Sequence, residues 1–479
     1  MYTTIATARL FLMGLAAAGL APAAMAQTDP KTDPETELVY YDVPDEAGRL
    51  SGGVVRLPIP DRDGPTIAAP FRTLALRGDP ANRIDLVFVG DGYTEGELGQ
   101  YAIDVDTLSV GLLADEPFAT YTPYFNIHAI EVVSPESGVD HDPTFGIYKD
   151  TALDMGFWCG NIERLLCVDV GKAYAHANNA PDVDQVLAIA NSSKYGGAGY
   201  SSSELATSSS RNSWAPEVLI HELGHSLGNL ADEYHYGDGT TYTGNEPGAV
   251  NASKLTRPEM ETLERKWFRW MDVSRTGFDN PIDTYEGAVY KQYGVYRPSP
   301  NSKMKALGRP FNLPSAEGTI VEIYKVVRPI ENASPDATLH GGERLFVEVL
   351  QPIGHNLEVQ WLIDGEPVAG ATETEFALCE QVIENGVHVV TVRVVDPTDM
   401  VRDETLRDQY LTQEYSWFLV YSGPPADFSG DGTVNTLDFL AFLNAWNAGE
   451  SNADLNHDGE INTLDVLGFL SLYTTGCLS

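Results

Sequence analysis

Residues 218–234 read VLIHELGHSLGNLADEY. An apolar lead-in is followed by a His-Glu-x-x-His pattern, and because a helix turns by roughly 100° per residue, His221 and His225 lie on one face, one turn apart. Both imidazoles can therefore reach one metal ion. Glu222 stands beside the first histidine, where it can hold and deprotonate a water that zinc has made acidic. The pattern predicts a zinc site for peptide hydrolysis, with Glu222 as the general base.

The run after the second histidine has to supply a third metal ligand. In the metzincin pattern this ligand stands three residues after the glycine, and here that position is Ala231, which cannot bind a metal. On an unbroken helix Asp232 would lie about 10 Å along the axis from the second histidine, but a turn at Gly228 brings it closer. We therefore predict Asp232 as the third ligand, ahead of Glu233 and then His235. The alternative is that Asp232 and Glu233 only orient a histidine or a loop.

The first 26 residues have the composition of a signal peptide. Arg9 is their only basic residue, an apolar core spans residues 10–20, and the small-x-small run AMA stands at 24–26. The core is shorter than the about 20 residues that a spanning helix needs, and no later stretch qualifies. We expect cleavage after Ala26 and a secreted protein without a membrane span.

The chain is strongly acidic, with a formal net charge of −39. Such a charge repels polyanions and attracts cations. It argues against nucleic acid and anionic membrane surfaces as partners.

The four cysteines are too few for a disulfide scaffold, although an exported chain can oxidise them. Cys159 and Cys167 stand eight residues apart in one segment and are the predicted bridge. Cys379 and Cys477 fall in other regions, and the sequence leaves open whether they are free or paired.

Hydrophobic patterns divide the chain after the signal peptide. Residues 27–82 show short apolar alternations interrupted by prolines, which indicates a β-rich leader. Residues 83–327 combine a helical pattern at 94–113, with Thr94 as N-cap, with apolar runs that predict buried strands. These runs are residues 84–90, 125–133 and 186–191. The strand-helix-strand order leading to the metal helix indicates an α/β domain.

Residues 191–200 read NSSKYGGAGY and form a polar, glycine-rich exit from the third predicted strand. In zinc peptidases, an edge strand beside the active-site helix pairs with an extended substrate. This segment is therefore a candidate wall of the substrate groove. The alternative is an ordinary flexible loop.

Several separated motifs resemble one known family. They are DLVFVGDGYT at 85–94, ESGVD at 136–140, SKYGG at 193–197 and the block at 221–234. Together they look like the IgA peptidase family of zinc endopeptidases, over about half of the chain. The resemblance implies a zincin-like α/β catalytic domain over residues 83–327 and a protein substrate.

The resemblance extends to YRPSPNSKM at 296–304. It implies that Met304 forms a methionine turn beneath the metal and that Tyr296 lines the catalytic site. From spacing alone, Met304 is an ordinary packed methionine. Cysteines that the family carries near this turn are absent, their places being held by residues such as Ser302 and Leu313. The family name suggests immunoglobulin as substrate, but no residue identifies the cleaved bond.

Residues 328–424 contain short alternating strands without a helical period. The runs at 345–350, 356–365 and 386–396 are examples, and Trp361 is placed to fill a core. These features suggest an immunoglobulin-like β-sandwich that serves as a spacer or binds proteins.

The C-terminal residues 425–479 carry an internal repeat. DFSGDGTVNTLD at 427–438 recurs as DLNHDGEINTLD at 454–465, 27 residues later. Each copy has the ligand spacing and central glycine of an EF-hand calcium loop, ending in Asp rather than Glu. The predicted Ca²⁺ ligands are Asp427, Ser429, Asp431, Thr433, Asn435 and Asp438, and Asp454, Asn456, Asp458, Glu460, Asn462 and Asp465.

Two such loops, each followed by an apolar helix, look like a type I dockerin. The resemblance implies a small all-α calcium-binding module that docks to a cohesin-like partner. The alternative is a calcium-stabilised stalk without a partner.

The leading hypothesis is thus a multidomain, secreted zinc metalloendopeptidase that acts on an extracellular protein or glycoprotein. A second hypothesis is a non-catalytic adhesin or scaffold component with a structural metal site, but such a site does not need Glu222. In a third, the third zinc ligand is a distant glutamate on another helix.

Overall fold

The computed structural model describes residues 36–45, 48–59, 62 and 64–477. The predicted signal peptide, residues 1–26, lies outside the described residues. The described chain belongs to one compact unit that begins at Thr36. Within it, none of the helices combines the length and hydropathy that crossing a bilayer requires.

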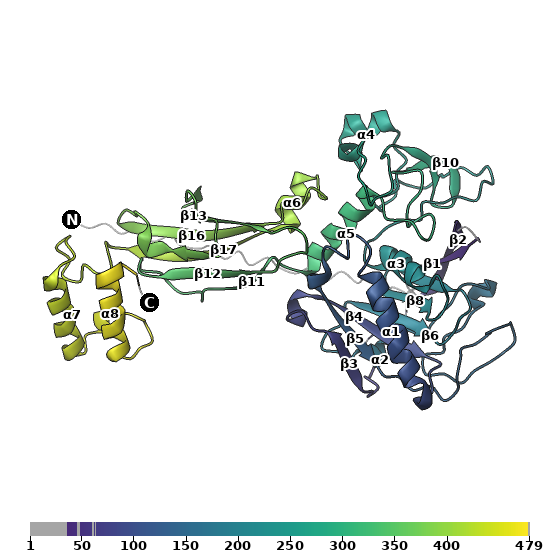
Figure 1. The fold of residues 1–479 in the computed structure, drawn as a ribbon. Helices are drawn as coiled ribbons and strands as arrows, with labels where there is room; N and C mark the ends of the chain where they lie inside the picture. Colours follow the sequence, from purple (N-terminus) through teal and green to yellow (C-terminus); the bar gives the residue numbers. More distant parts are fainter. Residues whose placement is uncertain (1–35, 46–47, 60–61, 63, 478–479) are drawn as a thin grey trace, which may run out of the picture. The chain divides into compact units, whose positions relative to one another are not determined.

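A mixed eight-stranded sheet organises the first half of the chain (Figure 1). Its order is β2-β1-β7-β8-β6-β4-β5-β3. Neighbours among β4, β5, β6 and β8 are parallel, whereas β7 is antiparallel to β8 and β1 is antiparallel to β7. The strands are β1 Thr36–Pro44, β2 Leu50–Pro58, β3 Phe71–Ala75, β4 Ile84–Asp91, β5 Phe125–Ile130, β6 Gln185–Ala190, β7 Gly197–Tyr200 and β8 Leu205–Ser209.

Helices cover both faces of this sheet. Leu86 and Phe88 of β4 face the core that includes α1 (Leu98–Leu112) and α3 (Ala215–Ser226). The alternate residues Val87 and Val89 face the core that includes α2 (Val170–Ala177). Because both faces are buried, β4 is apolar at successive positions instead of alternating. The predicted order of strands and helices is found in the structure.

The predicted leader over residues 27–82 is not a separate unit in its described part. Strands β1 and β2 form an antiparallel hairpin that extends the sheet beyond β7, and β3 pairs with β5 at the opposite edge. Val39 is fully buried in the same core as β4 and β6. A lone hairpin buries too little apolar surface to be stable in water, so these strands depend on the larger sheet.

Part of the segment between the end of α3 and residue 327 packs against the core that contains α3. Ile320 and Ile323 of α5 (Leu313–Val326) join the core of α1 and α3. A second cluster gathers Met260, Trp267 and Trp270 beside this region. The other elements here are α4 Arg257–Leu263, β9 Tyr285–Ala288 and β10 Lys291–Arg297. Short 3₁₀ helices along the chain are η1 Pro80–Asn82, η2 Glu95–Glu97, η3 Thr122–Tyr124, η4 Cys159–Asn161, η5 Phe268–Trp270, η6 Leu378–Glu380 and η7 Ser451–Ala453.

Two antiparallel sheets follow, and they share one hydrophobic core. Trp361 and Trp417 are both buried in it and stack with their ring centroids 5.8 Å apart. The sheets are β11-β12-β15 and β14-β13-β16-β17. Their strands are β11 Ile330–Ala333, β12 Arg344–Val349, β13 Glu358–Ile363, β14 Glu366–Pro367, β15 Glu375–Ala377, β16 Gly386–Val395 and β17 Thr412–Tyr421, with α6 at Glu404–Tyr410. The predicted strands are present, while the immunoglobulin-like topology stays a prediction.

A buried carboxylate joins this strand module to the first half of the chain. Asp396 accepts hydrogen bonds from the hydroxyls of Tyr121 and Tyr324, at 2.8 and 2.7 Å. His355 lies 2.8 Å from the other oxygen of the same carboxylate. These hydrogen bonds hold the pKa of Asp396 below its usual value, although burial alone would raise it.

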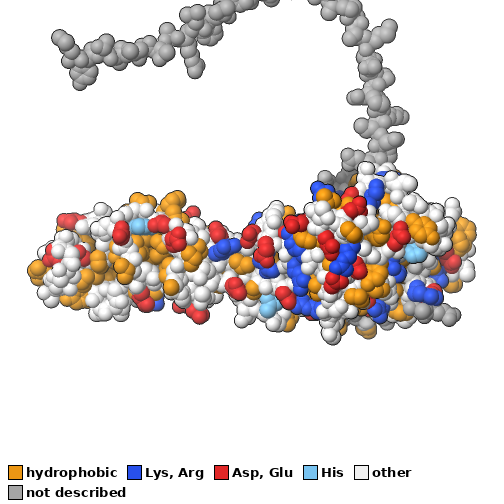
Figure 2. Space-filling model, turned by 90° about the horizontal axis from the view of Figure 1, so that it is seen from above, with side chains coloured by type: hydrophobic (Ala, Val, Ile, Leu, Met, Phe, Trp, Pro, Cys, Tyr) orange, Lys and Arg blue, Asp and Glu red, His pale blue; other side chains and the backbone are white. Residues whose placement is uncertain are grey.

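The C-terminal repeat forms two matching helices, α7 (Thr436–Ala448) and α8 (Thr463–Thr475). Asn435 and Asn462 cap them, each in a capping box with the aspartate three residues later. Phe442 and Phe469, at equivalent repeat positions, stack at 4.4 Å between the helices. Hydrophobic side chains are also exposed over this module, at the left of Figure 2.

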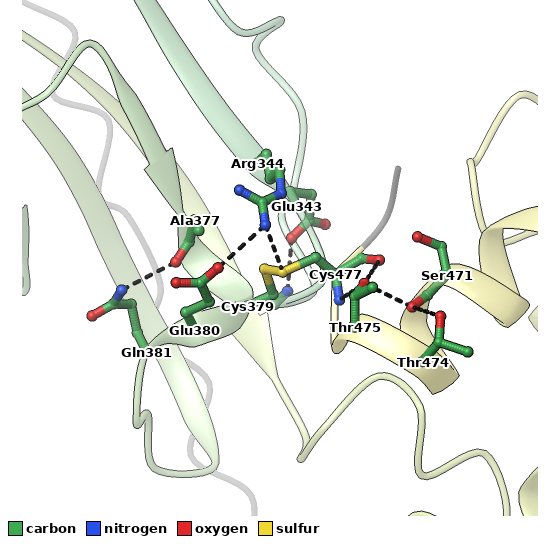
Figure 3. The surroundings of a disulfide bond; sticks show 11 residues. Glu343, Arg344, Ala377, Cys379, Glu380, Gln381, Ser471, Thr474, Thr475 and Cys477 are labelled. Carbon is green, nitrogen blue, oxygen red and sulfur yellow. Dashed lines mark hydrogen bonds and ion pairs between the residues drawn. A yellow bond between two sulfur atoms is a disulfide. The ribbon is translucent and has the colours of Figure 1, made fainter.

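The four cysteines form two disulfides. The predicted bridge between Cys159 and Cys167 is confirmed. The second bridge joins Cys379 in the strand module to Cys477 just after α8 (Figure 3). Arg344 of β12 lies against this second bridge and also pairs with Glu380. The strand module and the C-terminal repeat are therefore joined covalently twice, once by the main chain and once by this disulfide.

Replacing Cys379 and Cys477 together by serine should lower the opening free energy of α8 by about 2–4 kcal/mol, because the bridge closes a long loop in the unfolded chain. Hydrogen exchange of the α8 amides measures this free energy. The double replacement of Cys159 and Cys167 is the control and should leave α8 unchanged. Equal exchange of α8 in both double variants would contradict the expected role of the second bridge.

Candidate active site

Helix α3 carries His221, Glu222 and His225, and the chain turns sharply after it. The turn is closed by the amide of Leu230, which donates to the carbonyl of Gly224 at 2.9 Å. The left-handed residue of the turn is Asn229, with φ of 50°, and not Gly228 as we expected. Gly228 is needed for space instead, because a Cβ there would lie 2.8 Å from the Gly224 carbonyl oxygen.

This turn brings Asp232 to the two histidines. The Nε2 atoms of His221 and His225 are 3.2 Å apart, and Asp232 Oδ1 lies 3.3 and 3.5 Å from them. Zinc ligands at about 2.0–2.1 Å in a tetrahedron are separated by about 3.3 Å, so these three atoms have the spacing of one zinc ligand set. His221, His225 and Asp232 are also one of two groups in the described chain whose donor atoms could share a metal ion.

Backbone carbonyls orient both imidazoles. His221 donates from Nδ1 to the carbonyl of Lys303 at 2.9 Å, and His225 donates from Nδ1 to the carbonyl of Leu230 at 2.8 Å. The Nε2 atoms are therefore the ones left to face a metal. Asp232 is held in turn by the hydroxyl of Tyr290, which donates to Oδ2.

The other two residues considered as third ligand point elsewhere. The buried carboxylate of Glu233 accepts from the side chains of Asn251, Ser302 and Asn312, so it anchors the surrounding loops. His235 accepts the amide of Gly237 at its Nδ1 and is partly exposed.

Glu222 lies beside the histidines with nothing to satisfy its charge. The residue is fully buried, and neither carboxylate oxygen has a hydrogen-bond partner among the described residues. Burial raises the pKa of Glu222 well above its usual value, and the charge of Asp42 adds to this effect. Burying a carboxylate without hydrogen-bond partners costs folding free energy unless a cation or a water molecule compensates it. The donor set therefore fits a metal site with a water-activating carboxylate.

The pKa shifts of Asp232 and His221 favour their charged forms, whereas that of Glu222 favours its neutral form. Burial would raise the pKa of Asp232, but the neighbouring imidazoles of His225 and His221 hold it well below its usual value. For His221, burial lowers the pKa, but Asp42 and Asp232 raise it well above the usual value. The carboxylates thus create an environment that favours a positive charge.

Strand β7 lies directly against α3, where we predicted a wall of the substrate groove. A Cβ at Gly199 would lie 2.8 Å from Glu222 Oε2 and 3.2 Å from His225 Cβ. A Cβ at Gly197 would lie 2.5 Å from Val218. Only glycine allows the strand to approach the helix this closely. The glycines of residues 191–200 were thus the sequence feature from which this close approach of β7 to α3 could be predicted.

Met304 and Tyr296, both implied by the resemblance, have different positions. Met304 is buried under α3, with its Sδ 2.8 Å from where a Cβ of Gly224 would be. The ring of Tyr296 packs on the cluster of Trp267 and Trp270, and its role at the site stays a prediction. The tyrosine that contacts a predicted ligand from this part of the chain is Tyr290.

Two residues of β1 reach the site and were missed by the sequence-based prediction. Asp42 Oδ2 lies 2.6 Å from His221 Nε2, and Asp42 Oδ1 accepts from the hydroxyl of Tyr234 at 2.9 Å. The ring of Tyr40 stacks on His225 at 4.2 Å. Burial and the charge of Asp232 raise the pKa of Tyr40 to about 12. No local pattern could signal these contacts, since β1 reaches the site only through the pairing of distant strands.

The two predicted calcium loops are closed by their first and last aspartates. Asp427 accepts the amides of Asp431 and Gly432, and Asp454 accepts the amide of Gly459. At the other end, Asp438 accepts the amides of Ser429 and Asn435, and Asp465 accepts those of Leu455 and Asn462. The predicted ligand residues at intermediate positions, Thr433, Asn456, Asp458 and Glu460, lie between these ends.

Comparison with known families agrees with this arrangement. Residues 73–276 match the family model of IgA Peptidase M64, and residues 425–468 match that of the dockerin type I domain. No curated protein matches the chain. The first match contains α3 and Asp232 and begins after the β1–β2 hairpin. The chain is therefore a multidomain protein with a peptidase domain that matches the IgA Peptidase M64 family model and a C-terminal type I dockerin domain.

Proposed function

We propose that this protein is a secreted, zinc-dependent endopeptidase that hydrolyses an extracellular protein or glycoprotein. The observation that carries the proposal is the joint placement of three metal-facing atoms and one unpartnered carboxylate. His221 Nε2, His225 Nε2 and Asp232 Oδ1 have the mutual spacing of a zinc ligand set, and the Glu222 carboxylate beside them accepts no hydrogen bond from the described part of the chain.

The roles of the residues follow from their contacts. His221, His225 and Asp232 would hold the ion, which when bound makes a water acidic and polarises the scissile carbonyl. Glu222 takes the proton from the attacking water and passes it to the leaving amine. The carbonyls of Lys303 and Leu230 keep the imidazoles oriented, and Tyr290 does the same for Asp232.

A purely structural metal site is a weaker explanation. Structural zinc sites are closed by four protein ligands and do not need a free carboxylate beside them. Here Glu222 is retained at a site where burying it without a partner is costly. The protease family match supports the catalytic alternative over an adhesin or scaffold component. The spacing of Asp232 supports it as third ligand over a distant glutamate.

The C-terminal module supports an extracellular role for the protein. A type I dockerin implies a cohesin-like partner, and we propose that each loop binds one Ca²⁺ and that residues 1–26 direct export. Exposed leucines recur at equivalent positions of the two helices. Leu437 and Leu464 are 58% and 57% exposed, and Leu440 and Leu467 are 55% and 59% exposed. Such an apolar surface is suited to a protein partner.

Replacing Glu222 by Gln should lower the rate of peptide hydrolysis by about 10²–10⁴-fold, because the amide cannot accept the proton of the attacking water. Zinc content should stay at one ion per protease domain. Cleavage of a proteome-derived peptide library, read by mass spectrometry with and without a chelator, measures the rate. Undiminished cleavage by the variant would refute the assigned role.

Replacing Asp232 by Ala should weaken zinc binding by more than about 100-fold, because a direct ligand is lost where even neighbouring groups matter tenfold or more. Competition with a chromogenic chelator measures this affinity. Asp238→Ala is a suitable control, because that carboxylate is exposed and accepts hydrogen bonds from the amide and hydroxyl of Thr240. Equal zinc affinity of the two variants would point to a different third ligand.

The single variants Asp427→Ala and Asp454→Ala should each bind one Ca²⁺ ion instead of two, as counted by isothermal titration calorimetry. The first loop position supplies a carboxylate ligand in EF-hand loops. Glu450→Ala, an exposed acid between the loops, should keep both ions. Two ions in every variant would show that the loops do not bind calcium in this way.

A further inference from the structure

The candidate active site is closed to a polypeptide in this structure. His221 and Glu222 are completely buried, and His225 and Asp232 are each 1% exposed. An endopeptidase has to admit an extended segment of its substrate to these groups. The segment that covers them is part of the chain itself, the β1–β2 hairpin.

Strand β1 takes the position along β7 that an extended substrate would need. Val39 pairs with Tyr200 and Tyr40 pairs with Gly199, in antiparallel register. Gly199 is the residue of β7 that lies against Glu222 and His225. Backbone pairing with an edge strand is a common way to bind an extended peptide, and β1 occupies that edge.

Asp42 adds a specific block at the catalytic groups. Its Oδ2 lies 2.6 Å from His221 Nε2, the atom that faces the metal because Nδ1 is engaged with Lys303. Oxygen atoms of Asp42 and Glu222 also lie within 4.8 Å of each other and of His221. The carboxylate therefore lies close to both the metal-facing histidine and the proposed base. The attacking water and the scissile carbonyl have to enter the same space.

The hairpin is held on both sides of the site. On the side of the sheet, Glu37 accepts from the amide of Ser202 and the hydroxyl of Ser203. On the other side, the amide of Leu50 donates to the carbonyl of Lys305, and Gly48 accepts the amide of Leu307. These contacts bridge β7 and the segment that carries Met304, so the hairpin closes the site like a strap.

We propose that the β1–β2 hairpin is a built-in inhibitor of the peptidase, in which β1 takes the place of the substrate and Asp42 blocks the catalytic space. The proposal rests on the proposed function and adds its regulation. Two further facts support it. The family match begins at residue 73, after the hairpin, so the hairpin lies outside the part shared with the family model. Residues 65–68, which lead from the hairpin to β3, are exposed.

These exposed residues offer a site of activation. Hydrolysis of one peptide bond there, by a separate endopeptidase and with one water consumed, separates the hairpin from β3. The remaining contacts of the hairpin are non-covalent, so it can then leave. The edge of β7 and the space beside His221 become free for substrate.

The test uses the full-length protein in four forms. They are the natural chain, Asp42→Asn, the control Asp45→Asn, and a chain with a site-specific protease sequence inserted between Thr66 and Ile67 that is cut after folding. Asp45 is a matched control because it is an exposed carboxylate of the same hairpin. Three quantities are measured: hydrolysis of the peptide library, zinc affinity, and binding of a labelled peptide of residues 36–44.

Asp42→Asn should raise hydrolysis by about tenfold or more, because the competent population increases. It should weaken zinc binding by about tenfold, because a carboxylate beside the cation is lost. Changes of opposite sign distinguish an inhibitor from a residue that merely supports the site. Asp45→Asn should change neither quantity. The cut protein, freed of its hairpin, should be more active and should bind the labelled peptide, which then inhibits it.

The proposal is overturned if Asp42→Asn lowers hydrolysis together with zinc affinity, or if cutting leaves hydrolysis unchanged while other forms are active. It is also overturned if the hairpin-free protein does not bind the labelled peptide. That binding is measured in the Glu222→Gln background and needs no catalysis. If no form hydrolyses any peptide although zinc is bound, the proposed function fails, whereas peptide binding still decides whether the hairpin occupies this groove.

Discussion

The imidazoles of His221 and His225 and the carboxylates of Glu222 and Asp232 share a volume that water does not reach. Unpaired charges in such a place cost several kcal/mol each, so their arrangement has to provide compensation. Part of it comes from the Lys303 and Leu230 carbonyls and the Tyr290 hydroxyl, which orient three of these groups. The Nε2 atoms of His221 and His225 and Oδ1 of Asp232 lie close together, and a divalent cation there would compensate them. The folding of the surrounding loops is organised around this requirement.

Neighbouring elements also support this buried group of charges, by making room for it and by anchoring the loops around it. Gly199 and Gly224 have no side chains, so β7 and Met304 can both approach α3 closely. Glu233, next to Asp232, anchors the loops of Asn251, Ser302 and Asn312 without facing the metal position. The two adjacent acidic residues therefore have different roles. Asp232 lies at the candidate site, and Glu233 stabilises the loops around it.

Features with a local signal were predictable, and those that depend on distant pairing were not. The placement of His221, Glu222 and His225 on one helix and the two repeat loops follow from local spacing, and the approach of Asp232 to the histidines followed from the need for a turn. The sequence indicated the strands but not their order in the sheet. Since that order alone brings β1 to α3, Asp42 and Tyr40 could not be found, and the sequence left open whether the β-rich leader over residues 27–82 is independent. Tyr296 was chosen by resemblance, and the path of β9 and β10 brings Tyr290 to Asp232.

The short strand β7 has a further consequence for the protein once its outer edge is free. A sheet edge with unpaired amides and carbonyls can recruit strands of other molecules, and this is a common route to aggregation. β7 spans only Gly197–Tyr200, and two of its four residues are glycine. Such an edge offers few hydrogen bonds and little apolar surface to a stray strand. The glycines that let the strand approach α3 thus also lower the risk that strands of other molecules pair with its free edge and cause aggregation.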